Sequence, residues 1–414
     1  MSAYFDYSAT TPTDERVLSD MLPYFNENFG NPSSIHNFGQ KALAGVDKAR
    51  AQVAKFLNCD SNEIIFTSGA TESDNLAIKG FVCHLEKQGM RRRDMHIITS
   101  LVEHDAVLEP LMELNAEGVE VTHIKVKPNG VIDLEHFKKS ISLKTVLVSI
   151  MWVNSEVGAI MPIREIGKII KKINEKRERE WKKKRIKERG ERPRQIYFHT
   201  DATQAVNFFN CDVKWNYVDM LSLSGHKIYG PKGVGLLYKK EDIPLGAIQR
   251  GGHHENNFRS GTLNVPGIVG LGSAISRLNK TAQARNNKKI ANLRDELVEG
   301  IIKNIPDVIL NTDRENSAPA HAHFSFIGVE GESILISLDL EGIAVSTGSA
   351  CASSSLKASH VLVAMGIKIE IAHNSIRFSL GKHNTKEEIK IVIKKLPPII
   401  KRLRKINPLY KKGQ

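Results

Sequence analysis

Hydrophobic and polar positions follow two patterns that alternate along the first two thirds of the chain. Short runs rich in aliphatic and β-branched residues are typical of buried strands, and the stretches between them have helical spacing. One helix is expected over Gln40 to Leu57, where apolar side chains recur at three- and four-residue intervals. The runs expected to be strands are Glu63 to Phe66, His96 to Ser100, Val146 to Met151, Gln195 to His199, Met220 to Leu223 and Gly233 to Tyr238. Strands that alternate with helices predict a parallel α/β sheet covered on both faces.

The pattern changes after about Gly261. A long helical region is followed by runs expected to form a strand, a helix and two further strands, at Phe324 to Phe326, Glu332 to Leu340, Ile343 to Val345 and Ser375 to Ser379. A last helix is expected to begin at Thr385, because Thr385 and Glu388 have the spacing of a capping box. We therefore predict a large domain over residues 15–262 and a smaller α+β domain built from residues 1–14 and 263–414.

Length and composition are those of a globular protein. The chain has 414 residues, 41% of them hydrophobic, which is enough for a large core and for two or three domains. No run of about 18 apolar residues predicts a membrane span. The chain enters Tyr4 to Tyr7 without a charged and apolar leader. We therefore expect a soluble, cytoplasmic protein with no membrane contact.

The cysteines are few and scattered along the chain. Cys59, Cys83, Cys211 and Cys351 do not form the dense pattern of a disulfide framework, and no pair has the Cys-x-x-Cys spacing of zinc or redox sites. No metal site is expected. Three of them lie beside helix or loop residues and are interpreted as structural. Cys351 lies in a run of small residues, Ser346 to Ser355, which favours exposure of its thiol.

Most of the net charge comes from one segment. The chain carries a formal charge of +13. Between Lys171 and Arg194 there are thirteen Lys or Arg residues and five Glu, a net charge of +8. We interpret this basic segment as an exposed insertion, mobile or helical, whose charges are solvated. A docking surface for RNA or for an acidic protein is the alternative, although direct nucleic-acid binding is not the expected function of the chain.

A single lysine lies between the end of a strand and a glycine-rich turn in Ser222 to Gly233. Lys227 is flanked by Ser224 and His226, which can donate hydrogen bonds to a phosphate. A lysine that forms a Schiff base must be held in place and partly desolvated, and these neighbours suit that role. Most lysines are solvated surface charges, but this setting favours a Schiff-base lysine.

Two further segments place polar residues at the ends of predicted strands. Ile64 to Asn75 runs from a strand through Ser-Gly-Ala-Thr into a helix, whose first N–H groups and Thr71 hydroxyl suit a phosphate. A simple helix cap is the alternative. In His199 to Gln204 a strand carries Asp201 to its carboxyl end, where ligands bind in open α/β sheets. Such a carboxylate can pair with a pyridine nitrogen, or it can cap a helix.

Nine segments spread along the chain form a larger pattern. They are DYSATTP at Asp6 to Pro12, FGNPSSIH at Phe29 to His36, FTSGATESDNLAIKG at Phe66 to Gly80, EHDAV at Glu103 to Val107, HTDATQ at His199 to Gln204, SGHKIYGPKG at Ser224 to Gly233, RSGT at Arg259 to Thr262, STGSACASSS at Ser346 to Ser355, and SIRFSLG at Ser375 to Gly381. Together they resemble the cysteine desulfurases, class V aminotransferases among the fold-type I pyridoxal-phosphate enzymes, in the branch that supplies sulfur for iron–sulfur clusters. The resemblance covers nearly the whole chain apart from the basic segment. It implies an α/β large domain with a mostly parallel seven-stranded sheet covered by helices, and a smaller α+β domain.

The resemblance also implies how the chain binds pyridoxal 5′-phosphate. Lys227 would carry the cofactor as a Schiff base, His104 would stack on its ring and move protons, and Asp201 would pair with the pyridine nitrogen. The other cofactor-binding residues would be Ala70, Thr71, Ser224 and His226 at the phosphate, Gln204 at the ring hydroxyl, and Asn154 and Ser155 close to that hydroxyl. Thr262 would reach in from the partner subunit, which implies a homodimer.

The substrate and the reaction follow from the same resemblance. Arg377 would clamp the carboxylate of L-cysteine, a role that suits a planar two-pronged donor, and Asn31 would assist. The thiolate of Cys351 would attack the substrate's sulfur, so that alanine leaves and a persulfide remains. The persulfide would pass to an iron–sulfur scaffold protein or another acceptor, with tRNA thiolation as a further use. The chain departs from the family pattern at Ser155, where asparagine is usual, and at His253, where glycine is usual.

Two other functions stay open at this point. A selenocysteine lyase or another β-lyase of the same fold would not need Cys351 as a nucleophile. A catalytically silent scaffold or an RNA-binding protein would use the basic segment, but it would have no need of Lys227, Asp201, His104 and Arg377 together.

Overall fold

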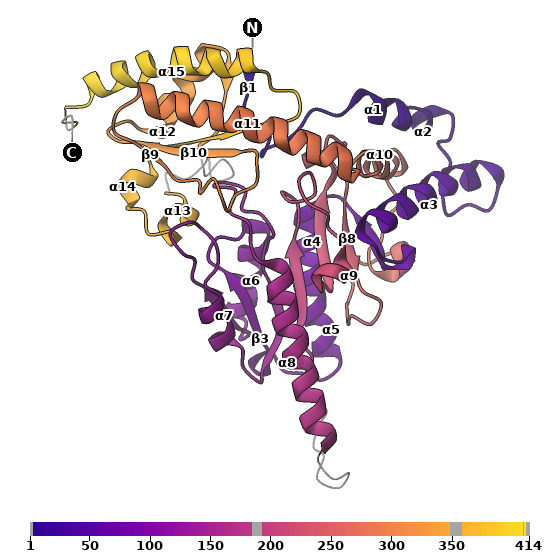
Figure 1. The fold of residues 1–414 in the computed structure, drawn as a ribbon. Coiled ribbons are helices and arrows are strands. Elements are labelled where there is room, and N and C mark those ends of the chain that lie inside the picture. Colours follow the sequence, from indigo (N-terminus) through magenta and orange to yellow (C-terminus); the bar gives the residue numbers. More distant parts are fainter. Residues whose placement is uncertain (1–2, 184–192, 348–357, 409, 411–414) are drawn as a thin grey trace.

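The computed structural model describes residues 3–183, 193–347, 358–408 and 410. They form a large part built around one central sheet and a smaller part that contains the end of the chain (Figure 1). No helix among these residues is long and apolar enough to cross a membrane.

A seven-stranded sheet forms the centre of the large part. Its strands are β2 (Ile64–Thr67), β3 (His96–Ser100), β4 (Glu120–Ile124), β5 (Thr145–Ser149), β6 (Tyr197–Asp201), β7 (Met220–Ser224) and β8 (Gly235–Lys239). Their order across the sheet is β2-β8-β7-β6-β5-β3-β4. Of these seven, β8 alone runs opposite to the others, because it pairs in antiparallel register with both β2 and β7 while the other pairs are parallel. The predicted mostly parallel seven-stranded sheet is confirmed.

Helices cover both faces of this sheet because neighbouring residues of a strand point to opposite sides. On one face, Phe66 and Phe198 belong to a core that includes α1 (Glu15–Met21), α3 (Asn37–Leu57), α8 (Ile163–Lys183) and α10 (Val265–Ser276). On the other face, Ile65 and Leu147 belong to a core with η2 (Leu76–Gly80), α5 (Phe81–Lys87) and α6 (Asp105–Ala116). The remaining helices of the large part are α2 (Pro23–Asn26), α4 (Ala70–Asn75), α7 (Leu134–Ser140) and α9 (Val213–Asn216).

The smaller part has a core of its own. Its elements are β1 (Ala3–Tyr4), β9 (Val308–Leu310), β10 (His321–Phe326), β11 (Ile343–Ala344), β12 (Ser375–Ser379), α11 (Lys280–Asn304), α12 (Gly331–Leu340) and α15 (Lys386–Ile406). The antiparallel sheet β12-β10-β9 packs against α11 and α15, and β1 pairs in parallel with β11. Phe5 packs edge-on against Phe378 in this core, with ring centroids 6.1 Å apart, so the first residues of the chain join its last third. Two short helices, α13 (His360–Ala364) and α14 (Ile369–Ala372), lie between β11 and β12 in the sequence. The division of the chain at residue 262 stays a prediction.

The predicted elements are found close to their expected bounds, and three strands of the structure were not predicted. Helix α3 begins at Asn37 rather than Gln40, because the ring of His36 caps it and accepts the N–H of Gly39 at 3.3 Å. The predicted capping box is present at the start of α15, where Thr385 and Glu388 bind each other's backbone N–H groups. Strands β4 and β9 were not predicted, since both are edge strands whose residues are in part exposed, and β1 was not predicted because it has only two residues.

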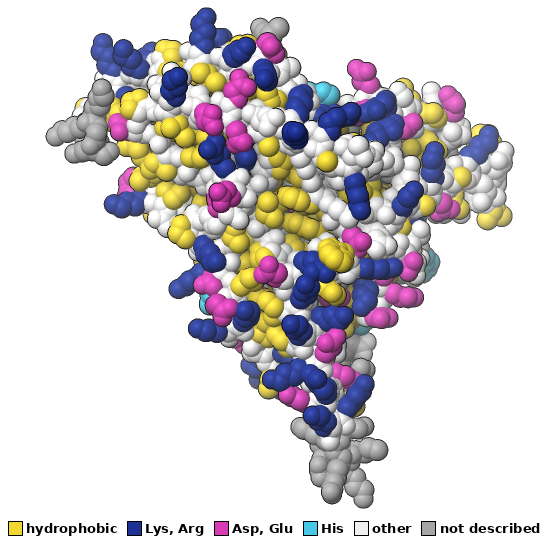
Figure 2. All heavy atoms as spheres, viewed as in Figure 1, with side chains coloured by type: hydrophobic (Ala, Val, Ile, Leu, Met, Phe, Trp, Pro, Cys, Tyr) yellow, Lys and Arg dark blue, Asp and Glu magenta, His cyan; other side chains and the backbone are white. Residues whose placement is uncertain are grey.

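The first half of the basic segment is helical. Helix α8 buries Ile163, Ile166 and Ile170 in its first turns and then leaves the body of the protein (Figure 1). Lys and Arg side chains surround its exposed part (Figure 2). Ion pairs four residues apart, such as Lys171–Glu175 at 3.9 Å, are typical of a solvated helix. Residues 184–192 of the segment lie outside the described residues.

Candidate active site

The carboxyl ends of five strands, β2, β3, β5, β6 and β7, lie beside a cavity of about 910 Å³. This is the edge of an open α/β sheet at which ligands bind. The residues proposed from the sequence that line this cavity are Ala70, Thr71, His104, Ser155, Asp201, Gln204, Ser224, His226, Lys227 and Arg377. Segments that are far apart in the sequence therefore supply one site.

Lys227 is held by the first residues of the chain. It ends the short helical turn η5 (Gly225–Lys227) that follows β7. Its Nζ donates to the backbone carbonyls of Ser8 and Ala9, the latter at 2.8 Å. These carbonyls stabilise the ammonium form, so Lys227 must leave them when its amine reacts with an aldehyde.

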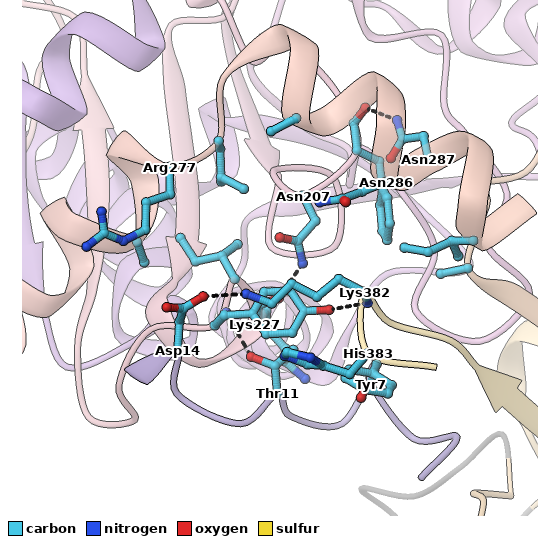
Figure 3. Close-up of a pocket in the computed structure, with 18 of the residues that line it drawn as sticks. Tyr7, Thr11, Asp14, Asn207, Lys227, Arg277, Asn286, Asn287, Lys382 and His383 are labelled. Carbon is cyan, nitrogen blue, oxygen red and sulfur yellow. Dashed lines mark hydrogen bonds and ion pairs between the residues drawn. The ribbon is translucent and has the colours of Figure 1, made fainter. Parts of the chain in front are cut away.

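A second cavity, of about 640 Å³, shares Ser8, Gln204 and Lys227 with the first (Figure 3). In its wall the carboxylate of Asp14 binds Nζ of Lys382 at 2.6 Å. Gln204 and Lys227 are the proposed site residues that line it. The first cavity is therefore the candidate active site.

One end of this cavity can hold a phosphate. Helix α4 begins at Ala70, so the N–H groups of Ala70 and Thr71 lie at the free start of a helix. The turn before α4 approaches β8 closely, because a Cβ on Gly235 would lie 2.6 Å from the Cα of Gly69. This close approach brings the start of α4 beside Ser224 at the end of β7; a Cβ on Gly69 would lie 3.7 Å from Ser224 Oγ.

His226 lies at the same end of the cavity and is neutral. Its Nδ1 lies 3.1 Å from Oγ1 of Thr10. Burial first, and then the charges of Lys227 and Lys232, lower the pKa of His226 to about 4. At neutral pH the ring can therefore donate one N–H to a phosphate without carrying a charge.

Asp201, Gln204 and His104 lie where the ring of a cofactor would be bound. One carboxylate oxygen of Asp201 accepts the N–H of Thr203 at 2.9 Å, which fixes the group at the end of β6 and leaves its second oxygen for a ligand. Gln204 donates to the carbonyl of Ser8 at 3.0 Å. His104 caps α6, because its Nδ1 accepts the N–H of Ala106 at 3.1 Å. The ring proton of neutral His104 is therefore on Nε2.

Arg377 lines the cavity and has one buried donor without a partner among the described residues. Its Nη2 binds Oδ1 of Asp6 at 2.8 Å and its Nη1 donates to the carbonyl of Ser155 at 3.0 Å. Its Nε is buried and has no hydrogen-bond partner among the described residues. A buried donor without a partner is costly, and a substrate carboxylate would supply the missing acceptor.

Three proposed residues do not line the cavity of this chain. Asn154 is buried, and its side chain binds three backbone groups through one donated and two accepted hydrogen bonds of 2.9 to 3.0 Å. Asn31 is exposed, and its side chain accepts the N–H of Ser33 at 2.9 Å. Thr262 is exposed as well. The roles proposed for these three residues stay predictions.

Cys351 lies outside the described residues, but the chain on either side of its segment reaches the cavity. Ser346 forms two backbone hydrogen bonds with Arg377, of 2.7 and 3.2 Å. Ala358 lines the cavity. The other three cysteines do not line it. Burial raises the pKa of Cys59 to about 12, and it also raises the pKa of fully buried Cys211. These two thiols are therefore poor sources of a thiolate at neutral pH.

Asp6, Ser8, Asp74 and Glu103 belong to the site but were not proposed from the sequence. Glu103 accepts the N–H of Met151 at 2.9 and 3.0 Å and the hydroxyl of Ser100 at 2.5 Å. Burial nevertheless raises its pKa to about 8. The four residues lie inside or beside the segments quoted above, and this was the one signal that could have indicated them.

The residues present fit pyridoxal 5′-phosphate. The cavity has neutral donors at one end, a carboxylate at the end of β6, and a lysine between them. The unpartnered Nε of Arg377 adds a place for the carboxylate of an amino acid. The cavity thus contains a side chain of suitable chemistry for each part of the cofactor, namely its phosphate, pyridine nitrogen and aldehyde, and another for the substrate.

Comparisons with known proteins agree with this arrangement. The model of the family "Aminotransferase class-V" matches residues 3–176 and 183–392, so it omits only part of the exposed half of α8 between them. A protein of Clostridium botulinum named "Cysteine desulfurase IscS" is 46% identical over 409 residues, which cover 98% of this chain and 96% of the relative.

Solved structures have the same fold. A structure described as "NIFS-LIKE PROTEIN" is 37% identical, with a TM-score of 0.86 over 97% of this chain and 100% of the other. A second, described as "SspA in complex with cysteine", is 33% identical, with a TM-score of 0.76 over 93% of this chain and 100% of the other. The chain is similar to these proteins over nearly its whole length.

Proposed function

Because the chain belongs to the class-V aminotransferase family and is a pyridoxal-phosphate-dependent cysteine desulfurase, we propose that it moves the sulfur of L-cysteine onto Cys351 and releases L-alanine. The observation that carries this proposal is that Arg377, whose Nε has no hydrogen-bond partner among the described residues, lines the same cavity as Lys227 and Asp201. An amino acid whose carboxylate binds Arg377 would lie in the same cavity as Lys227. The similar structure described as holding cysteine supports this choice of amino acid.

Each residue of the cavity has a defined task in this reaction. When bound, pyridoxal phosphate withdraws electrons from the Cα and Cβ atoms of an amino acid. Asp201 would keep the pyridine nitrogen protonated, and Arg377 would fix the carboxylate. The amine of Lys227 would remove the proton from Cα, with Nε2 of His104 as a second group that can hold it. The start of α4, with Ser224 and His226, would anchor the phosphate.

The sulfur step needs a thiolate. Cys351 as thiolate would attack the sulfur of the substrate, so that an S–S bond forms while the Cβ–S bond breaks and its electron pair passes to the carbon skeleton. Protonation of that carbon gives alanine, and the persulfide stays on the enzyme. Cys351 is four residues after Thr347, the last described residue before it.

We further propose the setting in which the enzyme works. Exposed Thr262 would reach the phosphate site of a second copy, so that the active form is a homodimer. An iron–sulfur scaffold protein or another acceptor would receive the persulfide sulfur, and the reaction would take place in the cytoplasm. Resemblance to the family supports these proposals.

Replacement of Cys351 by serine tests the proposed sulfur transfer. Cys351→Ser is expected to bind the cofactor normally and to release alanine at least about 1,000-fold more slowly, because a serine hydroxyl is hardly ionised at neutral pH. Cys83→Ser, which changes a half-buried cysteine outside the cavity, is the matched control and should keep full turnover. Mass spectrometry after a cysteine pulse should find the extra sulfur on the Cys351 peptide. Normal alanine release by Cys351→Ser would instead favour a β-lyase.

A further inference from the structure

Asp74 is a buried acid that lines the cavity. It lies on α4, one turn after the start of the helix, and is 0% exposed. It lines the same cavity as Asp201. Neither of its carboxylate oxygens has a hydrogen-bond partner among the described residues. Since a buried carboxylate is stable only when it is paired or accepts hydrogen bonds, this geometry favours a neutral carboxylic acid.

Among the residues that the structure describes, no cation lies beside Asp74. The ring of His199 lies 3.5 Å from Oδ1 of Asp74, but its two nitrogens contact the hydroxyls of Ser149 at 2.9 Å and Ser222 at 3.0 Å. Burial lowers the pKa of His199 to about 3, so the ring is neutral at physiological pH.

The other titratable groups that act on Asp74 are Asp201 and Glu103, which are both acids. Burial first, and then the charge of Asp201, raise the pKa of Asp74 well above its ordinary value. Contact with the Ser222 hydroxyl opposes this rise, and Glu103 adds to it. Three carboxyl groups thus line the cavity, and a neutral imidazole lies beside one of them.

We propose that Asp74 is a positioning residue that carries a proton, so that Asp201 remains the one negative charge beneath the pyridine ring of the cofactor. A second carboxylate beside Asp201 would raise the proton affinity of Asp201 and weaken its pairing with a pyridinium. A neutral Asp74 removes that competition and can donate its own proton as a hydrogen bond. The inference rests on the proposed function, because it assumes that Asp201 faces pyridoxal phosphate.

Infrared spectroscopy of the full-length holoenzyme tests the proton directly. The difference between wild type and Asp74→Asn at pH 7 should contain the C=O stretch of a protonated carboxylic acid. Glu103 is present in both proteins and cancels. A difference spectrum with carboxylate bands alone would overturn the proposal.

The pH dependence of folding gives a second, independent measurement. A group whose pKa is raised in the folded state contributes stability below its unfolded pKa, and this contribution is lost as the pH rises toward the folded value. Relative to Asp74→Asn, the unfolding equilibrium constant of the wild-type chain should therefore rise roughly tenfold per pH unit, or about 100-fold from pH 5 to pH 7. Asp74→Ala should show the same trend from a lower starting stability. A constant ratio would mean that Asp74 is ionised in the folded protein.

Binding of the cofactor completes the test. Asp74→Asn is the neutral isostere of a protonated aspartic acid, so it should bind pyridoxal phosphate within about threefold of wild type and keep the ¹⁵N shift of a protonated ring nitrogen. Asp201→Asn should lose both properties. Failure of Asp74→Asn to fold, or loss of cofactor equal to that of Asp201→Asn, would overturn the inference. These measurements do not involve Cys351 or alanine release, so failure of the sulfur-transfer proposal would be recognised separately.

Discussion

Arg377 and Asp6 form a buried ion pair in which Nη2 lies 2.8 Å from Oδ1, although 371 positions separate them in the sequence. The side chain of Arg377 is 5% exposed, and Asp6 is the acid that pairs with it. The pair fixes the plane of the guanidinium before any substrate binds. It therefore also fixes the direction of Nε, which has no hydrogen-bond partner among the described residues.

Removal of the charge on Asp6 should weaken substrate binding. Asp6→Asn is expected to raise KM for L-cysteine about tenfold, with a smaller effect on kcat, because a charge-assisted hydrogen bond that orients Arg377 is lost. Steady-state kinetics with L-cysteine would measure this. Asp14→Asn, which removes the partner of Lys382 in the second cavity, is the control and should leave KM unchanged. An unaltered KM in Asp6→Asn would mean that Ser155 alone orients the guanidinium.

Lys227 should be the one covalent attachment point of the cofactor. Borohydride reduction of the wild-type enzyme is expected to fix the cofactor to the peptide that contains Lys227, because a reducible imine needs a positioned amine. Lys227→Ala should bind the cofactor without any covalent adduct after reduction. Lys232→Ala removes an exposed lysine from the wall of the same cavity and should retain the adduct. Mass spectrometry of peptides decides the matter, and an adduct on another lysine would contradict the assignment.

The loop before Thr262 should depend on one ion pair for its shape. Glu255, Asn256 and Asn257 all have positive φ angles, of 45°, 54° and 67°. The carboxylate of Glu255 holds this conformation by binding Arg50 at 2.6 Å and the N–H of Phe66 at 2.7 Å. Such a run of left-handed residues is costly and persists only where the surroundings enforce it.

Glu255→Ala is therefore expected to lower the free energy of unfolding by about 3 kcal/mol, as removal of one partner of a buried pair does. Lys79→Ala breaks an exposed pair with Glu113, at 2.8 Å, and should cost less than about 1 kcal/mol. Thermal and urea unfolding of both variants would measure the difference. Equal effects would show that the ion pair of Glu255 is not what holds the loop.

The exposed half of α8 should be dispensable for turnover. Deletion of residues 179–191 with a short linker is expected to change alanine release less than about twofold, since none of the cavity residues lies there. A longer deletion, of residues 171–194, also removes the hydrogen bond of Asn174 to the carbonyl of Ile196, at 2.8 Å. It should lower the melting temperature. A large loss of turnover in a folded, cofactor-bound short deletion would show that the helix contributes to the site.

The strand-end residues of the site could be predicted because each carries a local pattern. Asp201 follows a run of buried residues, and Lys227 follows a strand and precedes a glycine-rich turn, so strand direction alone places them at the same edge of the sheet. The start of α4 was indicated by its Ser-Gly-Ala-Thr turn in the same way. Periodicity therefore predicted the central sheet and its ligand-binding edge.

The remaining site residues could not be predicted because their roles depend on partners far away in the sequence. Nothing near Asp6 or Asp74 in the sequence shows that one is paired with Arg377 and that the other is a buried acid close to Asp201. The hydrogen bonds of the Asn154 side chain to three backbone groups likewise depend on the packing of the folded chain. Whether neighbouring groups stabilise or destabilise a buried charge depends on their positions in the folded protein. The spacing of hydrophobic residues along the chain does not contain that information.

The long-range contacts of residues 3–9 have a consequence for folding during synthesis on the ribosome. Ala3 pairs with Ile343, and the carbonyls of Ser8 and Ala9 bind Lys227, so this segment contacts residues that are synthesised more than two hundred positions after it. This segment therefore has to remain without these partners while the central sheet forms, and it docks only when the last third of the chain has emerged. Contacts of such long range are slow to form. Lys227 thus acquires its native neighbours only at the end of synthesis. We therefore expect the cofactor to bind during late maturation and not during early folding.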